Sequence, residues 1–230
     1  MSRAIVLFYH DVVLYKDDFE LLNEHQWLND TCIEFYMEYL EKTKLIPQKN
    51  EEEDRLTIFL LRPGLTFLIS NIQDAQFLAS ALPREIYTAE IIFMPINNNP
   101  NPTRAGGGTH WSLVVYLRAQ QRFLHYDSVQ GFNIAVARAA VERVADLLDV
   151  KEISFLPMLT PQQDNGADCG VFVISIIDYL VNRILTNSTN FDTDREMQIS
   201  STNEITSPGE MRLRLRQLVE QLRGDSQSLR

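Results

Sequence analysis

The sequence predicts an α+β fold in which helices near both ends of the chain enclose a central sheet. Apolar residues recur at helical spacing over 29–40 and 133–148, which indicates amphipathic helices. Short runs rich in β-branched and aromatic residues, typical of strands, occupy 90–96, 109–117 and 123–128 between them. Helices gathered at the ends and strands gathered in the middle are the pattern of an α+β domain.

Length and composition fit one soluble domain over 1–230 with a substantial core. Hydrophobic residues make up 45% of the chain and charged residues 23%. The net charge is −10 and no basic stripe is present, which argues against nucleic acid as a partner. No apolar run approaches the roughly 20 residues that span a bilayer, so we expect no membrane association. Two cysteines are too few for a disulfide-built domain. We therefore expect a reducing compartment, the cytoplasm or the nucleus. A monomer is also expected.

Five segments are predicted in the N-terminal part of the chain. Residues 4–15 indicate a strand or an irregular edge segment. A helix follows over 29–40, where an Asn-Asp pair caps its first turn. The acidic cluster at 51–54 indicates a solvated loop. Short helices are predicted over 63–69, opened by proline, and over 74–82, ended by proline.

The middle of the chain is predicted to form the sheet and one helix. The segment 97–108 is too rich in Asn, Pro and Gly to hold regular structure, so we expect a loop there. The helix is expected over 133–148. Strands are predicted over 90–96, 109–117, 123–128 and 152–158, the second and third of which form the simplest hairpin.

The C-terminal part begins with an apolar segment that runs from Cys169 to about residue 185. Its β-branched residues suit a strand, but its length favours a buried helix. The Ser/Thr/Asn-rich stretch 187–207 is expected to be a flexible insertion. An amphipathic terminal helix is predicted over 208–222, and a disordered tail over 224–230.

Cys169 is the candidate nucleophile, because it lies where a Gly/Asn/Asp loop runs into the predicted buried helix. Unpaired N–H groups and the positive end of a helix favour a thiolate at such a position. A free cysteine has a pKa of roughly 8.5, so this setting can make a thiol nucleophilic near neutral pH.

The candidate bases are the four histidines. His10 and His25 have no polar constellation nearby in the sequence, so we interpret both as surface or core histidines. His110 begins the first strand of the predicted hairpin, and His125 lies in the second strand, two residues before Asp127. A histidine in the middle of a strand is usually structural, which favours His110 as the base.

The register of the predicted hairpin can be worked out from its turn. A two-residue turn at Ala119-Gln120 places Asp127 opposite Ser112 and diagonal to His110 on the same face. Diagonal neighbours lie about 7–8 Å apart, so an Asp–imidazole hydrogen bond is within reach. His125 shares that face, and the register alone leaves it as an alternative.

Gln163 is the candidate oxyanion donor, because it lies six residues before Cys169 on the loop that leads to it. A side-chain amide and the Cys169 backbone N–H together suit the developing charge of a tetrahedral intermediate.

Four sequence boxes then resemble those of the Ulp/sentrin-specific cysteine protease family. They are QWLND (26–30), GTHWSLVVYL (108–117), HYDS (125–128) and PQQDNGADCG (161–170). The resemblance covers about residues 5–185 and is closest to the deneddylase branch. It implies a papain-like (Ulp-type) fold, a central mixed sheet flanked by helices, with 1–230 as a single catalytic domain.

The resemblance also assigns roles to seven residues. It implies Cys169 as nucleophile, His110 rather than His125 as general base, Asp127 as its orienter and Gln163 as oxyanion donor. Three further residues match the family's substrate positions: Trp27 and Trp111 would flank a narrow tunnel, and Asp30 would lie near its opening.

The implied activity is cleavage after the C-terminal Gly-Gly of a ubiquitin-like modifier of the Nedd/Rub type. Both precursor processing and deconjugation from lysine are expected, with the modifier and conjugates such as cullins as partners. The chemistry needs neither a metal nor an organic cofactor. The alternatives are a SUMO- or ubiquitin-directed isopeptidase, a Cys-dependent acetyltransferase, and a non-catalytic binder of a ubiquitin-like protein.

Two features of the sequence qualify the resemblance. Ala167 stands where the family usually has an aromatic residue, two positions before the cysteine, which puts the reaction rate or the rigidity of the loop in doubt. The glycine run 106–108 is expected to make the loop before His110 mobile, as a flap that substrate orders.

Overall fold

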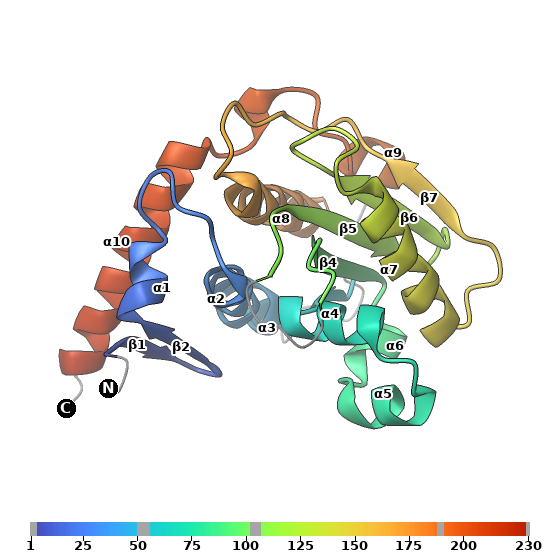
Figure 1. The fold of residues 1–230 in the computed structure, drawn as a ribbon, viewed down its shortest axis with the longest axis horizontal. Helices are drawn as coiled ribbons and strands as arrows, with labels where there is room; N and C mark the ends of the chain where they lie inside the picture. The colour runs from blue at the N-terminus through green and yellow to red at the C-terminus, as the bar shows by residue number, and fades with distance from the viewer. Residues whose placement is uncertain (1–3, 50–55, 102–106, 188–190, 229–230) are drawn as a thin grey trace.

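A computed structural model describes residues 4–49, 56–101, 107–187 and 191–228. Its centre is a five-stranded sheet covered by helices on both faces, and a separate two-stranded hairpin lies near the N-terminus (Figure 1). The sheet has the strand order β3-β4-β5-β6-β7. The outer pairs β3–β4 and β6–β7 are parallel and the inner pairs antiparallel, so the expected mixed sheet is confirmed.

One strand of the central sheet was not predicted. The hairpin near the N-terminus consists of β1 (Ile5–Tyr9) and β2 (Val12–Tyr15). The unpredicted strand β3 has three residues, too few to show an alternating pattern. The sheet comprises β3 (Ile58–Leu60), β4 (Ile91–Asn97), β5 (Trp111–Leu117), β6 (Arg122–Tyr126) and β7 (Ser154–Pro157).

The helices fall close to their predicted positions, with four short additions. The additions are α1 (Lys16–Glu20), α3 (Ile46–Lys49), α6 (Glu85–Thr88) and α9 (Thr193–Glu196), and a π-helical turn, Glu41–Leu45, precedes α3. The others are α2 (Asp30–Leu40), α4 (Pro63–Asn71), α5 (Ala75–Ala81), α7 (Ile134–Leu147), α8 (Cys169–Thr186) and α10 (Pro208–Ser228).

Two hydrophobic cores lie on opposite faces of the sheet, because alternate residues of each strand point to opposite sides. On β4, Phe93 belongs to the core with α2 and α8, whereas Ile92 and Met94 belong to the core with α4 and α7. The helix α10 packs against α8 and β1 on the first of these faces.

The β5–β6 hairpin has the predicted register. Leu113 pairs with Tyr126 and Leu117 with Arg122, as the turn at Ala119-Gln120 requires. His110 therefore lies one residue before β5 and Asp127 one residue after β6, side by side at one end of the sheet.

The helix α8 confirms the predicted buried helix. By length and composition it is the one described helix that could span a membrane, but 72% of it is buried inside the protein. Its apolar residues on all sides are those of a core helix between α2 and the sheet.

The C-terminal region differs from the sequence-based expectation. The expected insertion 187–207 contains α9, and Met197, Ile199 and Ile205 in it are buried in the core. These apolar residues are separated by polar ones, which concealed them in the composition. The helix α10 continues to Ser228 through part of the expected disordered tail. Residues 188–190 and 229–230 lie outside the described residues.

Candidate active site

Cys169 is the first residue of α8, where the preceding loop turns into the helix. The side chain of Asn165 makes that turn, because its Oδ1 accepts hydrogen bonds from the backbone N–H groups of Ala167 (2.9 Å) and Asp168 (3.2 Å). Hydrogen bonds therefore hold the loop at Ala167, where the family's aromatic side chain is missing. Cys169 is 3% exposed and borders a cavity of ≈ 650 Å³.

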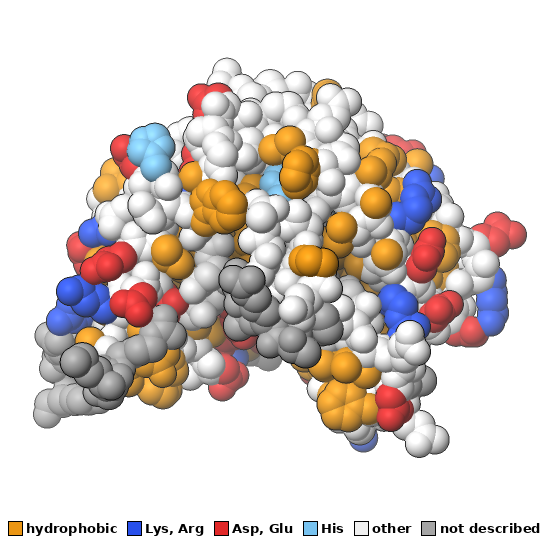
Figure 2. Space-filling model, viewed as in Figure 1, with side chains coloured by type: hydrophobic (Ala, Val, Ile, Leu, Met, Phe, Trp, Pro, Cys, Tyr) orange, Lys and Arg blue, Asp and Glu red, His pale blue; other side chains and the backbone are white. Residues whose placement is uncertain are grey.

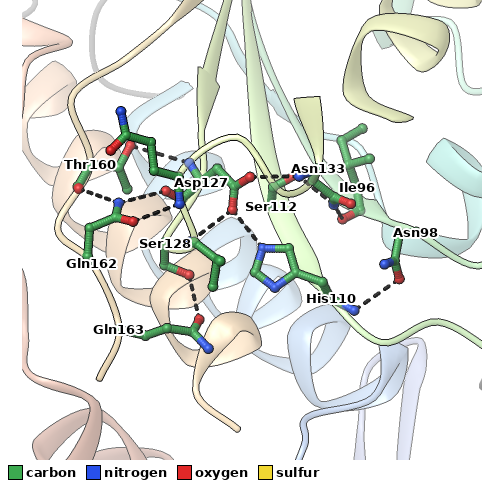
Figure 3. Close-up of polar contacts among 12 residues, drawn as sticks. Ile96, Asn98, His110, Ser112, Asp127, Ser128, Asn133, Thr160, Gln162 and Gln163 are labelled. Carbon is green, nitrogen blue, oxygen red and sulfur yellow. Dashed lines mark hydrogen bonds and ion pairs between the residues drawn. The ribbon is translucent and has the colours of Figure 1, made fainter. Parts of the chain in front are cut away.

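His110 joins Asp127 to Cys169. Its Nε2 lies 2.6 Å from Asp127 Oδ1, and both side chains are buried (Figure 3). Cys169 lies close enough to act on the pKa of His110, and both residues border the same cavity. The structure thus brings the predicted carboxylate, imidazole and thiol together in one place.

The charge states of His110 and Asp127 follow from burial and from their neighbours. Burial acts to lower the pKa of His110, but hydrogen bonds and charge from Asp127 and Cys169 outweigh it and raise this pKa to about 9. Burial acts to raise the pKa of Asp127, yet hydrogen bonds from His110 and from the backbone N–H groups of Asn133 (2.9 Å) and Val129 (3.1 Å) lower it. At neutral pH, a protonated imidazole therefore lies between a carboxylate and the sulfur.

His125 occupies a different environment. It stacks on Phe155 with ring centroids 5.5 Å apart, and it does not border the cavity. Its Nε2 is buried without a hydrogen-bond partner among the described residues, and burial lowers its pKa to about 4. His10 and His25 are exposed, as expected. Of the four histidines, His110 is the one that the structure places against Asp127 and Cys169.

Cys32, the other cysteine, is fully buried, and both cysteines are free thiols. Its Sγ lies 3.4 Å from the carbonyl oxygen of Asp18, to which it donates. Burial raises its pKa to about 12, so Cys32 remains a neutral thiol in the physiological range.

The described residues contain no group of three or more His, Cys, Asp or Glu side chains placed to hold a metal ion.

Gln163 is held on the loop before the nucleophile. Its Oε1 accepts a hydrogen bond from Ser128 Oγ (2.8 Å), and its Nε2 donates to the carbonyl oxygen of Asn165 (2.6 Å). Gln163 does not border the cavity. An amide group has two N–H donors, so one bond to Asn165 leaves a second donor. The Cys169 N–H lies in the first turn of α8 and has no partner inside the helix.

The three predicted substrate residues, Trp27, Asp30 and Trp111, all border the same cavity as Cys169. Trp111 is buried and donates from Nε1 to the carbonyl oxygen of Leu28 (3.1 Å), whereas Trp27 is 49% exposed. On this face of the molecule, hydrophobic side chains lie on both sides of a histidine, and charged side chains lie mostly toward the edges (Figure 2). The cavity is therefore bordered by one buried and one exposed indole.

Sequence reasoning missed the amide side chains that hold His110 and Asp127 in place. Asn98 Oδ1 accepts from the backbone N–H groups of Thr109 (2.7 Å) and His110 (3.0 Å). Gln162 Nε2 donates to the backbone carbonyl of Asp127 (3.0 Å) (Figure 3). Both residues lie in segments whose composition indicates only loops, and their partners are distant in sequence.

The Asn-rich loop also explains two of the glycines before His110. A Cβ on Gly108 would lie 1.7 Å from Asn97 Oδ1, and one on Gly107 would lie 2.5 Å from Asn99 Oδ1. Both glycines thus pack closely against asparagine side chains of the facing segment. Gly106, the first glycine of the expected flap, lies outside the described residues.

Comparisons with known proteins agree with this geometry. A model of the Ulp1 protease family, C-terminal catalytic domain, matches residues 26–207. NEDD8-specific protease 1 of Arabidopsis thaliana is 36% identical over 172 residues, 74% of this chain and 72% of that protein. Sentrin-specific protease 8 of Homo sapiens is 32% identical over 188 residues, 80% of this chain and 85% of that protein.

A solved structure shows the same fold. The C-terminal Ulp1 protease domain, in complex with Smt3, the yeast ortholog of SUMO, matches with a TM-score of 0.61 at 21% identity. The match covers 96% of this chain and 89% of that chain, which confirms the expected Ulp-type fold. Because the family model covers most of the chain and relatives above 30% identity match most of their own length, the chain belongs to the Ulp1 protease family of cysteine peptidases.

Proposed function

We propose that this enzyme cleaves after the C-terminal Gly-Gly of a NEDD8-type modifier. The observation that carries the proposal is the arrangement of three side chains, Asp127, His110 and Cys169. They lie together at a cavity that Trp27 and Trp111 also border. The choice of modifier rests on the relatives named as NEDD8-specific. We extend it to removal of the modifier from lysine side chains, with conjugates such as cullins as substrates.

The proposed reaction begins with the protonated His110 next to the sulfur. The Cys169 thiolate attacks the carbonyl carbon of the terminal glycine and forms a C–S bond, and the carbonyl electrons move to the oxygen. The Cys169 N–H and the second N–H of Gln163 stabilise that oxyanion. The intermediate collapses with cleavage of the C–N bond, and the leaving amine takes the proton of His110.

Hydrolysis of the thioester completes the cycle. His110, now neutral, takes a proton from water as the water oxygen attacks the thioester carbon. The C–S bond breaks, the modifier leaves as a carboxylic acid that loses its proton to solvent, and the thiolate and protonated His110 are restored. Asp127 keeps the imidazole oriented and stabilises its charge in both steps.

The aromatic residues at the cavity suit a tail of two glycines. Glycine has no side chain, so an extended Gly-Gly segment is thinner than any other dipeptide. In the proposal, the indoles of Trp27 and Trp111 bind this tail and exclude bulkier residues. Asp30, at the start of α2, lies beside the same path.

Parallel kinetics on modifier fusions test the proposal. NEDD8, SUMO and ubiquitin, each fused after Gly-Gly to the same reporter, are compared by kcat/KM. We expect the NEDD8 fusion to be preferred by at least about 100-fold, as discrimination by several contacts outside the tail predicts. Cys169→Ala is the control and must abolish turnover. Preference for SUMO or ubiquitin would contradict the choice of modifier, and turnover by Cys169→Ala would contradict the nucleophile.

A further inference from the structure

A buried arginine from the C-terminal helix reaches the residue before the nucleophile. Arg212 on α10 is 3% exposed, and its Nε and Nη2 both donate to Asp168 Oδ1, at 2.9 and 2.7 Å. Asp168 immediately precedes Cys169 and occupies the N-cap position of α8. The family model ends at residue 207, so Arg212 lies beyond the part of the chain that it matches.

The same guanidinium holds the segment that leads to Trp27. Its Nη1 donates to the backbone carbonyls of Leu21 (3.0 Å) and Asn23 (2.7 Å), and its Nη2 donates to that of Gln26 (2.6 Å). A longer contact of 3.5 Å joins Nη2 to the carbonyl of Ala167. In Figure 1, α10 lies alongside α1 and the chain that follows it. One side chain therefore ties together α10, the approach to Trp27 and the approach to Cys169.

The segment before Trp27 and the loop before Cys169 both affect the proposed reaction. The peptide bond between Asp168 and Cys169 carries the N–H that the proposed oxyanion hole uses. The side chain of Asp168 fixes this peptide between Arg212 and Asn165, whose Nδ2 donates to Asp168 Oδ2 (2.7 Å). The positive charge of Arg212 also balances a carboxylate that is one residue from the sulfur.

We propose that Arg212 is a positioning residue for the reaction, which acts through Asp168 on the Cys169 N–H and through Gln26 on Trp27. The inference rests on the proposed function for the role of that N–H. It makes α10 part of the active-site architecture, although none of the α10 side chains that the structure describes borders the cavity.

A purely structural role is the competing explanation. The helix α10 is already anchored by Met211, Leu215 and Val219, which are fully buried. Removing only Arg212 leaves the Asp168 carboxylate buried without its charge partner, which destabilises a fold by itself, so stability is measured beside kcat. An effect of Arg212 on the chemistry that exceeds its effect on stability therefore distinguishes positioning from anchoring.

The test compares Arg212→Met with Arg214→Met. Arg214 also joins α10 to a carboxylate of α8, through Nη1 to Asp178 Oδ2 (2.9 Å), but that pair lies away from Cys169 in the sequence of α8. We expect Arg212→Met to lower kcat roughly 100-fold, as for a misplaced oxyanion donor. Arg214→Met should leave kcat within about twofold, as for a residue outside the reacting groups. Both are measured below their melting temperatures.

A second readout needs no modifier. The rate at which iodoacetamide alkylates Cys169 is measured across pH for each variant. In Arg212→Met the unbalanced Asp168 carboxylate disfavours the thiolate, so the pH midpoint of alkylation should move upward. Adding Asp168→Asn should reverse this shift. The alkylation midpoint can shift in Arg212→Met even if the protein without substitutions does not cleave the NEDD8 fusion. That pair of results would support the positioning role and overturn the proposed substrate.

Arg212→Lys keeps the test decisive if Arg212→Met does not fold. Lysine retains the charge but cannot reproduce the fork of donors, so the alkylation midpoint should remain and kcat should still fall roughly tenfold. An unchanged kcat in Arg212→Lys overturns the inference. So does an Arg212→Met variant that matches Arg214→Met in both kcat and alkylation profile.

Discussion

His110 lies between a carboxylate and a sulfur, and its properties come from both. The short contact with Asp127 fixes the orientation of the ring, and Cys169 lies close enough to contribute to the raised pKa of His110. Because these partners raise its pKa to about 9 from an ordinary 6.5, protonated His110 stabilises the folded protein fully below about pH 6.5. That stabilisation is lost as the pH rises through about 9.

Asp127→Asn tests this coupling. Loss of the carboxylate removes the hydrogen bond and charge that raise the pKa of His110, so the alkaline fall of kcat/KM should move from near pH 9 to lower pH. We expect kcat to fall roughly 100- to 10,000-fold because the ring loses its orienting charge. Asp149→Asn, at an exposed aspartate in an ion pair with Lys151, is the control. If the alkaline fall of kcat/KM stays at the same pH in Asp127→Asn, the proposed roles of His110 and Asp127 are contradicted.

His125→Phe tests the other histidine of the hairpin. Burial lowers the pKa of His125 to about 4, so the folded protein loses stability as the pH falls from about 6.5 toward 4. Phenylalanine preserves the stacking on Phe155 and removes this penalty. As the pH falls over this range, the free energy of unfolding of the variant should rise relative to that of the original protein by an amount on the order of 3 kcal/mol. Its kcat at neutral pH should be unchanged, and a large loss of kcat would favour His125 as the base.

At the scale of elements, three segments meet at the site: the start of β5, the end of β6 and the start of α8. Their positions were predictable, because the turn at Ala119-Gln120 determines the hairpin register and the length of the apolar run determines α8. The hydrogen bonds that hold these three segments in place could not be predicted. Asn98 and Gln162 reach partners that are distant in sequence or on another segment, and no local pattern indicates such contacts.

Gly170→Ala tests the close packing at the start of α8. A Cβ there would lie 2.9 Å from Leu28 Cβ and 3.5 Å from Trp111 Cδ1, so Leu28 has to move. Leu28 also accepts the hydrogen bond of Trp111, and the shift therefore reaches the cavity. We expect kcat/KM for the modifier fusion to fall roughly 10- to 100-fold.

Gly209→Ala is the matched control for this substitution, because a Cβ at that position in α10 meets nothing within 4 Å. It should leave kcat/KM unchanged and preserve or slightly raise stability, as Gly→Ala does in helices. Equal effects of the two substitutions would show that the packing of Gly170 is not specific to the cavity.

At the scale of the whole molecule, the C-terminal helix completes both the core and the site. The amphipathic pattern predicted this helix, but not the burial of Arg212, since an arginine in such a pattern is normally solvated. The weakly apolar composition of 187–207 likewise concealed the buried Met197, Ile199 and Ile205. Tertiary burial of scattered residues is the information that composition does not carry.

Two truncations test the contribution of α10. A chain that ends at Ser207 loses Met211, Leu215 and Val219 from the core, roughly 5–9 kcal/mol of burial, which is comparable with the stability of a whole domain. We expect it to fail to fold, as judged by circular dichroism. A chain that ends at Asp225 loses only the last turn and the terminus and should keep its melting temperature within about 2 °C. A folded and active chain ending at Ser207 would contradict the role of α10.

Covalent trapping tests the central claim most directly. NEDD8, SUMO and ubiquitin, each with an electrophile in place of the terminal carboxylate, are mixed with the protein, and the adducts are identified by intact mass and peptide mapping. We predict one adduct, formed fastest with NEDD8, attached to Cys169 and absent from Cys169→Ala. Attachment to Cys32, or equal trapping by Cys169→Ala, would contradict it.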